Sequence, residues 1–145
     1  MKKLILLLFL FICWNTFSQK TKKQYFVIDK NDALIKKQIA TKANQYEGYL
    51  IINEKKKVKK TIRASHLSGD DIVYDAFEEL SFAFNRNNDT IVNKLYFNKL
   101  KTIKNRRDFL DLNKSFNEKN MEYIFIEPIN CKKYILRKVR PVIFE

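Results

Sequence analysis

Glycine, proline, cysteine, histidine and tryptophan are all scarce in this chain of 145 residues. It contains two glycines, two prolines, two cysteines, one histidine and one tryptophan. So little glycine and proline excludes a collagen-like or low-complexity chain. Twelve phenylalanines and seven tyrosines indicate instead a folded protein with a core rich in aromatic rings.

The chain has no apolar stretch long enough for a permanent membrane helix, which needs about 20 residues. The longest stretch, residues 4–13, follows Lys2 and Lys3 and precedes small polar residues. This order is typical of a secretory signal peptide. We therefore expect residues 1–18 to be a signal peptide and the mature protein to be exported, either to the periplasm or out of the cell.

The predicted cleavage site lies between Ser18 and Gln19. Thr16 and Ser18 supply the small side chains that signal peptidase requires. An uncleaved anchor and a lipoprotein acylated at Cys13 are the two alternatives, and the bulky Ile12 before the cysteine argues against the second. After cleavage we expect no transmembrane anchor.

Cysteine is too rare in the mature chain for a disulfide framework. Once Cys13 has left with the signal peptide, only Cys131 remains, so no intrachain disulfide can form. We expect Cys131 to be a small buried residue, with pairing between two molecules as an alternative. A catalytic thiol would need a histidine partner, and His66 is the single histidine.

Residues 19–145 suit a single domain. Apolar runs and helix-capping residues predict its elements. Strands are predicted at residues 25–28, 49–52, 123–126 and 134–136, helices beginning at Asn31 or Asp32, at Ser68 and at Asn105, and turns at residues 55–57, 85–89 and 127–130. The second helix is predicted from the helical spacing of Ile72, Val73, Ala76, Phe77 and Leu80. It either continues to Phe84 or ends near Glu79, where the alternation of Leu80, Phe82 and Phe84 favours a strand. The third helix should bury Phe109, Leu112 and Phe116. Such interspersed elements predict an α+β fold, a mostly antiparallel sheet covered by two or three helices.

The candidate catalytic residues surround His66. It could act as a general base oriented by Asp70 or Asp71, because its pKa lies near neutrality. Alternatively, it is an ordinary loop residue, and the aspartates favour the start of the following helix. We expect no cofactor and no metal, since a catalytic zinc site takes three protein ligands and the mature chain offers one histidine and one cysteine.

An acidic stripe follows on the predicted second helix. Asp71, Asp75 and Glu78 recur at helical spacing, with Asp70 and Glu79 beside them. A calcium site or a pair of glycosidase carboxylates would use such residues. Three carboxylates along one helix repel each other, however, so we interpret the stripe as a solvated face.

Positive charge is the strongest compositional signal, since the chain has 29 basic and 16 acidic residues and a net charge of +13. Clustered cations attract anionic partners such as lipid headgroups, lipopolysaccharide and acidic glycans. Nucleic acid is a less natural partner outside the cytoplasm, and codon bias alone is an alternative source of the lysines. The candidate anion-binding residues are Lys55, Lys56, Lys57, Lys59, Lys60, Arg63, Arg106, Arg107, Lys132, Lys133, Arg137 and Arg140.

These observations favour a small, basic, non-enzymatic binding or accessory module of the bacterial cell envelope, whose partner is an anionic component or another envelope protein. A small hydrolase that uses His66 with Asp70 or Asp71 is the first alternative. A protein-binding inhibitor or accessory subunit is the second.

Overall fold

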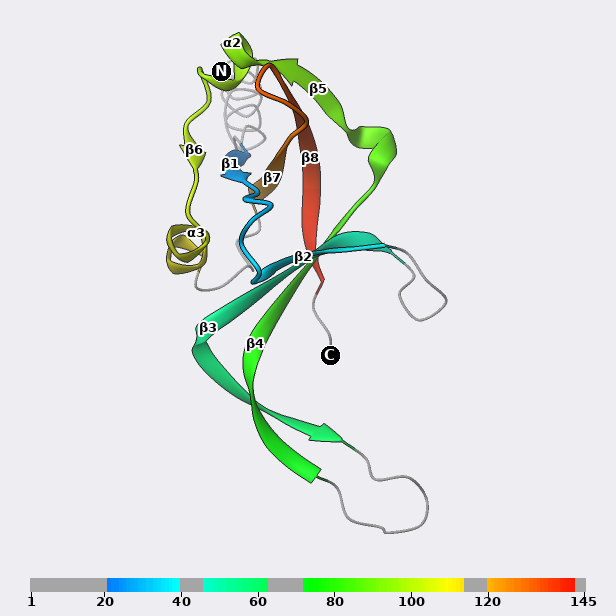
Figure 1. The fold of residues 1–145 in the computed structure, drawn as a ribbon, viewed down its shortest axis with the longest axis vertical. Coiled ribbons are helices and arrows are strands. Elements are labelled where there is room, and N and C mark those ends of the chain that lie inside the picture. Colours follow the sequence, from blue (N-terminus) through cyan, green and yellow to red (C-terminus); the bar gives the residue numbers. More distant parts are fainter. Residues whose placement is uncertain (1–20, 40–45, 63–71, 114–119, 143–145) are drawn as a thin grey trace, which may run out of the picture.

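The computed structural model describes residues 21–39, 46–62, 72–113 and 120–142. Strands make up 62% of these residues and helices 14%, and one eight-stranded mixed sheet carries only two short helices (Figure 1). The predicted α+β class is therefore wrong, because the protein is mostly β.

The sheet has the strand order β2-β3-β4-β8-β7-β1-β6, and β5 pairs separately with β8. Strand β1 runs parallel to β6 and β7, and the other pairs are antiparallel. The strands are β1 (Lys22–Val27), β2 (Ile35–Gln38), β3 (Glu47–Ile62), β4 (Ile72–Phe84), β5 (Thr90–Asn93), β6 (Thr102–Ile103), β7 (Met121–Pro128) and β8 (Lys133–Val142), and the helical elements are η1 (Arg86–Asn88), α2 (Lys94–Phe97) and α3 (Arg106–Leu112).

Two of the predicted helices are strands. The first helix was expected at Ile35, but this residue lies in strand β2 and pairs with Ile51 of β3. The second was expected from the spacing of Ile72, Ala76 and Leu80, but these residues lie in β4 and pair with β3 along its whole length. Short apolar runs fit both periods, and pairing with a neighbouring strand overrides the local preference.

The turn expected at residues 55–57 is also wrong, because these lysines lie inside β3. The register between β3 and β4 shifts between Asn53 and Lys57. Residues 54–56 therefore form a bulge, which accommodates extra residues in one strand and increases its local twist. The chain continues beyond the bulge instead of turning back.

The third helix is confirmed at its start and wrong at one buried position. Asn105 caps α3 by accepting a hydrogen bond from the Arg107 backbone N–H. Phe109 is fully buried and Leu110 nearly so, but Leu112 is 65% exposed. Phe116 lies outside the described residues. The apolar face of α3 is thus narrower than predicted.

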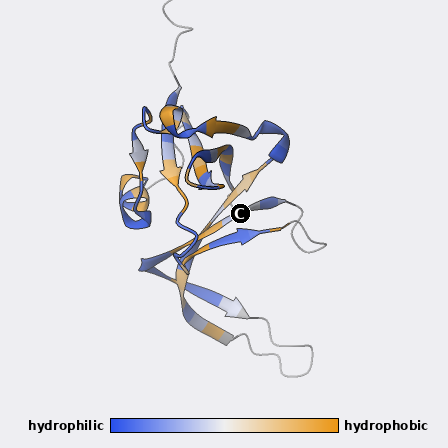
Figure 2. Ribbon diagram, turned by 45° about the horizontal axis from the view of Figure 1, so that its top comes forward, coloured by the Kyte–Doolittle hydropathy of each residue, from blue (hydrophilic) through white to orange (hydrophobic). Residues whose placement is uncertain are grey.

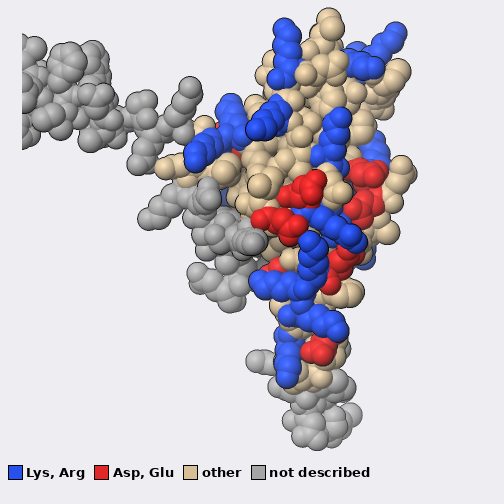
Figure 3. Space-filling view, turned by 90° about the vertical axis from the view of Figure 1, so that its left-hand side faces the viewer, with Lys and Arg blue, Asp and Glu red and all other residues tan. Residues whose placement is uncertain are grey.

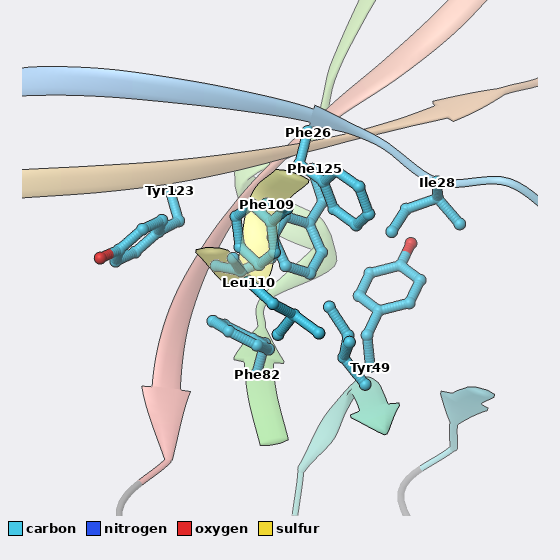
Figure 4. Packing of buried hydrophobic residues seen from close by; sticks show 10 residues of the cluster. Phe26, Ile28, Tyr49, Phe82, Phe109, Leu110, Tyr123 and Phe125 are labelled. Carbon is cyan, nitrogen blue, oxygen red and sulfur yellow. The ribbon is translucent and has the colours of Figure 1, made fainter. Parts of the chain in front are cut away.

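The main core is a cluster of aromatic rings on one face of the sheet (Figure 4). Phe109 of α3 stacks on Phe26 of β1 with ring centres 4.4 Å apart, and it meets Phe125 of β7 edge to face at 5.5 Å. Phe82 and Tyr49 bring β4 and β3 into the same cluster. Such ring pairs add to the stabilisation from area burial alone.

A smaller apolar cluster, built on Ile124, Ile126 and Leu136, brings α2 and β5 against β7 and β8. Phe97 of α2 stacks on Tyr134 of β8 with ring centres 4.1 Å apart. The predicted C-terminal hairpin is confirmed, since β7 and β8 pair from Tyr123 to Pro128. Its turn was expected at residues 127–130 but lies at residues 129–132, because Glu127 and Pro128 still pair with β8.

Candidate functional site

The predicted catalytic residues His66, Asp70 and Asp71 lie outside the described residues, as do Arg63 and the predicted cleavage site at Ser18 and Gln19. Within the described ranges, no group of three or more histidine, cysteine or acidic side chains is placed to hold a metal ion. The hydrolase alternative therefore stays a prediction.

The acidic stripe does not form, because its described members lie on a strand and not on a helix. Successive strand side chains point to opposite faces, so Asp75 and Glu78 are separated. Glu78 forms an ion pair with Lys56 and accepts a hydrogen bond from Asn53, and Glu79 contacts Lys60 at 2.5 Å. These carboxylates partly neutralise neighbouring lysines.

Two of the candidate anion-binding arginines are buried inside ion pairs. The Arg106 side chain, 7% exposed, donates to Asp32 at 2.9 Å and to the Ile52 carbonyl at 2.6 Å. Its second ion pair reaches Glu54 at 3.3 Å. Arg106 therefore fixes the β2 and β3 region to α3 and cannot meet an external anion.

Arg137 occupies a buried polar site on the core side of β8. It contacts Glu127 and Asp89 at 3.1 Å each and donates to the Tyr49 hydroxyl at 3.3 Å. Burial raises the pKa of the Tyr49 hydroxyl well above its usual range. Burial also raises the pKa of Asp89, and the positive charge of Arg137 only partly opposes it. The ionic network is structural, because it is enclosed by the sheet.

Arg107 and three of the candidate lysines, Lys55, Lys56 and Lys60, also have acidic partners. Arg107 contacts Glu54 at 2.5 Å, and this hydrogen bond lowers the pKa of the Glu54 carboxyl. Lys55 pairs with Asp111 at 3.0 Å between two exposed side chains. Such exposed pairs contribute about 0–1 kcal/mol each, so they can exchange for an anionic partner at small cost.

The candidate basic residues lie at opposite ends of the sheet. Lys132 lies at the β7–β8 turn beside Lys94 of α2, whose backbone N–H donates to the Lys132 carbonyl at 3.0 Å. Lys57 and Lys59 lie on the β3–β4 hairpin, which projects from the opposite end of the sheet (Figure 1). On the face that Figure 3 shows, acidic side chains lie among the basic ones from the body down to this hairpin. The positive charge on this face is therefore interrupted by acidic side chains.

Cys131 is exposed at the β7–β8 turn, which overturns the expectation of a buried thiol. Strand β7 ends at Pro128 and β8 begins at Lys133, so residues 129–132, which include Cys131, form the turn between them. The Asn130 side chain accepts hydrogen bonds from the backbone N–H groups of Lys132 and Lys133. The side chain of Cys131 consequently has no place in either core cluster.

The most distinctive surface is the end of the β3–β4 hairpin, residues 57–62 and 72–77, which we call the arm. None of the described side chains of the arm belongs to either core cluster. Val73 is 57% exposed, Phe77 46% and Tyr74 42%. In Figure 2 the β4 side of the arm carries hydrophobic segments beside a mainly hydrophilic β3. Large apolar side chains are thus presented to solvent on a two-stranded projection.

One face of the arm combines two of these apolar side chains, Val73 and Phe77, with two lysines, whereas Tyr74 points to the other face. Lys57 lies opposite Phe77, Lys59 opposite Asp75 and Thr61 opposite Val73. Residues directly opposite in neighbouring strands point to the same side of the sheet. Neither Lys57 nor Lys59 forms an ion pair with any described residue. This lysine–apolar face is the candidate binding surface.

The lysines of this face were predicted as anion-binding residues, but its apolar residues were predicted in the wrong element. The spacing of Val73 and Phe77 predicted a helix, whereas both are exposed on a strand. The strand alternation of Val73, Asp75 and Phe77 was the available signal.

No helix among the described residues is both long enough and apolar enough to cross a membrane. No family model matches the sequence, and neither a curated protein nor a solved structure matches it at the significance expected of a relative.

Proposed function

We propose that the protein is a non-enzymatic, exported binding module of the cell envelope, which docks through the lysine–apolar face of its arm onto an anionic lipid surface. The observation that carries the proposal is the juxtaposition of Lys57 and Lys59 with Phe77 and Val73 on one side of a projecting hairpin.

The arm is poorly suited to remain alone in water. A two-stranded hairpin without a covering layer is marginally stable, and clustered exposed apolar side chains mark interaction surfaces. Here Val73 and Phe77 are both exposed on the lysine–apolar face of the arm. A partner that buries them would stabilise both the side chains and the strand pairing.

The charges of the arm specify the chemistry of that partner. Among the described residues of the arm, three are basic, Lys57, Lys59 and Lys60, and one is acidic, Asp75. A lysine near an anionic membrane contributes about 1 kcal/mol of attraction, and apolar side chains at the same depth insert between headgroups. An anionic lipid surface satisfies both parts of the face, whereas a soluble polyanion would leave Phe77 and Val73 in water.

Vesicle binding of the purified protein tests the proposal. We expect it to sediment with vesicles of phosphatidylcholine containing phosphatidylglycerol, less so with phosphatidylcholine alone, and more weakly as salt rises. Lys57→Glu with Lys59→Glu should reduce the affinity at least about tenfold, and Val73→Ser with Phe77→Ser should reduce it further at high salt.

The matched control is Lys22→Glu with Lys23→Glu, which changes the charge equally on exposed positions of β1. It should retain most of the binding. Loss of binding equal to that of the arm variant would overturn the proposal, as would absence of binding to anionic vesicles. Capture of an envelope protein without vesicle binding would favour an accessory subunit instead and would also overturn it.

A further inference from the structure

The sheet opens on one side of β8. Residues 133–136 of β8 pair with β5, and residues 139–142 of β8 pair with β4. Between them η1 carries the chain away from β8. Arg137 and Lys138 therefore have no strand partner on this side.

A groove of about 370 Å³ lies at this opening. This volume falls in the range of small-molecule sites, about 300–1,000 Å³. Its lining comes from the end of β4, the η1 turn and β8, together with the residue before β3. The residues that the argument uses are Tyr46, Ala83, Asn85, Asn88, Lys138 and Arg140.

Small residues keep one wall of the groove open. Ala83 lines it, and the residue opposite Ala83 in β3 is Gly48. A Cβ atom at Gly48 would lie 2.2 Å from the Phe82 carbonyl oxygen, so the close approach of the strands excludes any side chain there. The neighbouring strands thus contribute no bulky side chain at this pair.

The groove is cationic and has no acidic lining residue. Arg140 is exposed and forms no ion pair with any described residue, and Lys138 has only a 3.4 Å contact with Glu122. Arginine presents several donors in a fork that matches a carboxylate or a phosphate. The Asn85 carboxamide oxygen already accepts from the Asn87 N–H, which leaves its NH₂ group for a ligand. Asn88 and the Tyr46 hydroxyl can serve the hydroxyls of a ring.

We infer that this groove binds an anionic sugar, with Arg140 contacting the carboxylate or phosphate and the asparagines contacting ring hydroxyls. The groove lies on the body of the protein, and its residues are separate from those of the arm. The inference therefore stands independently of the lipid-docking proposal.

Calorimetry with three probes tests the inference and distinguishes the two sources of negative charge. Glucuronate carries a carboxylate, glucose 6-phosphate carries a phosphate, and glucose is the neutral reference. We expect at least one anionic sugar to bind at least tenfold more tightly than glucose. Arg140→Gln should weaken that binding at least tenfold, because it removes the forked cation and leaves an uncharged polar side chain.

Lys36→Gln is the matched control, since it removes one positive charge from an exposed position of β2. It should leave the affinity unchanged, as should the arm variant Lys57→Glu with Lys59→Glu. Equal affinities for anionic and neutral sugars, no binding of either anion, or full binding by Arg140→Gln would each overturn the inference.

Discussion

The Arg137 guanidinium carbon lies 4.5 Å from the centre of the Phe84 ring. A cation over a ring face is attracted by the negative charge of the π system, more strongly when both are removed from water. Arg137 is buried, and its donors also reach Glu127, Asp89 and Tyr49. One side chain therefore ties β8 to β3, β4, β7 and the start of β5, at the place where β8 has no strand partner on one of its two sides.

Replacing Arg137 by methionine should destabilise the protein by about 3–5 kcal/mol. The substitution preserves much of the apolar stem but leaves the carboxylates of Glu127 and Asp89 without their shared cation. Urea unfolding followed by far-ultraviolet circular dichroism measures the change. Tryptophan fluorescence is unsuitable, because the single tryptophan, Trp14, lies in the predicted signal peptide.

Arg140→Met is the matched control for this prediction, since Arg140 is an exposed arginine on the same strand. It should change the free energy of unfolding by about 0.5 kcal/mol or less. Equal effects of the two substitutions would show that the buried network contributes nothing particular to stability.

The Glu127 carboxyl makes part of the stability depend on pH. Burial opposes its ionisation, but the hydrogen bond from Lys37 and the charge of Arg137 prevail, so its pKa lies below the usual 4.5. Between the lower native pKa and 4.5 the unfolded chain binds more protons than the native one, so stability falls as pH falls through this window. Asp89, whose pKa is raised, has the opposite sign and offsets part of the loss.

Glu127→Gln should therefore lose less stability than the wild type when the pH is lowered from 6 to 3, although it is less stable at pH 6. Urea unfolding at several pH values provides the measurement. Parallel pH profiles for the two proteins would contradict the assignment of acid sensitivity to Glu127.

Helix α3 offers a matched pair of substitutions. Phe109→Ala removes the ring that contacts Phe26 and Phe125 at the centre of the core, and it should cost about 3–5 kcal/mol. Leu112→Ala, on the exposed side of the same helix, should cost about 0.5 kcal/mol or less. Thermal unfolding of both variants separates the two cases. A large effect at Leu112 would mean that this side chain is covered in solution.

The sequence predicted correctly those elements that depend on interactions between residues close together in the chain. Asn105 caps α3 through its own side chain, and the β7–β8 hairpin joins residues close in sequence. Strand β4 was misassigned because the spacing of Ile72, Ala76 and Leu80 also fits a helix, and only pairing with β3 decides between the two. That pairing cannot be seen in either segment alone.

The buried arginines show a second limit of sequence analysis. Charge clustering indicated Arg106, Arg107 and Arg137 as anion-binding residues, but composition does not reveal which acids fold against them. One signal was present at Arg137. Arg137 lies two positions from both Ile135 and Val139 along β8, so strand periodicity places all three on one face. Val139 on this face belongs to the core. The partners, Asp89 and Glu127, come from other strands or loops and could not be deduced.

Strand β8 is the common neighbour of β4, β5 and β7, and it follows all three along the chain. During synthesis these strands emerge before the one that joins them, so the native sheet cannot close until residues 133–142 are available. Joining β4 and β5 to β8 is slow, because these contacts close long loops. A nascent chain of this topology therefore stays unfolded for longer than a chain whose paired strands are all neighbours in sequence. A polypeptide that is still unfolded can be threaded through a narrow channel.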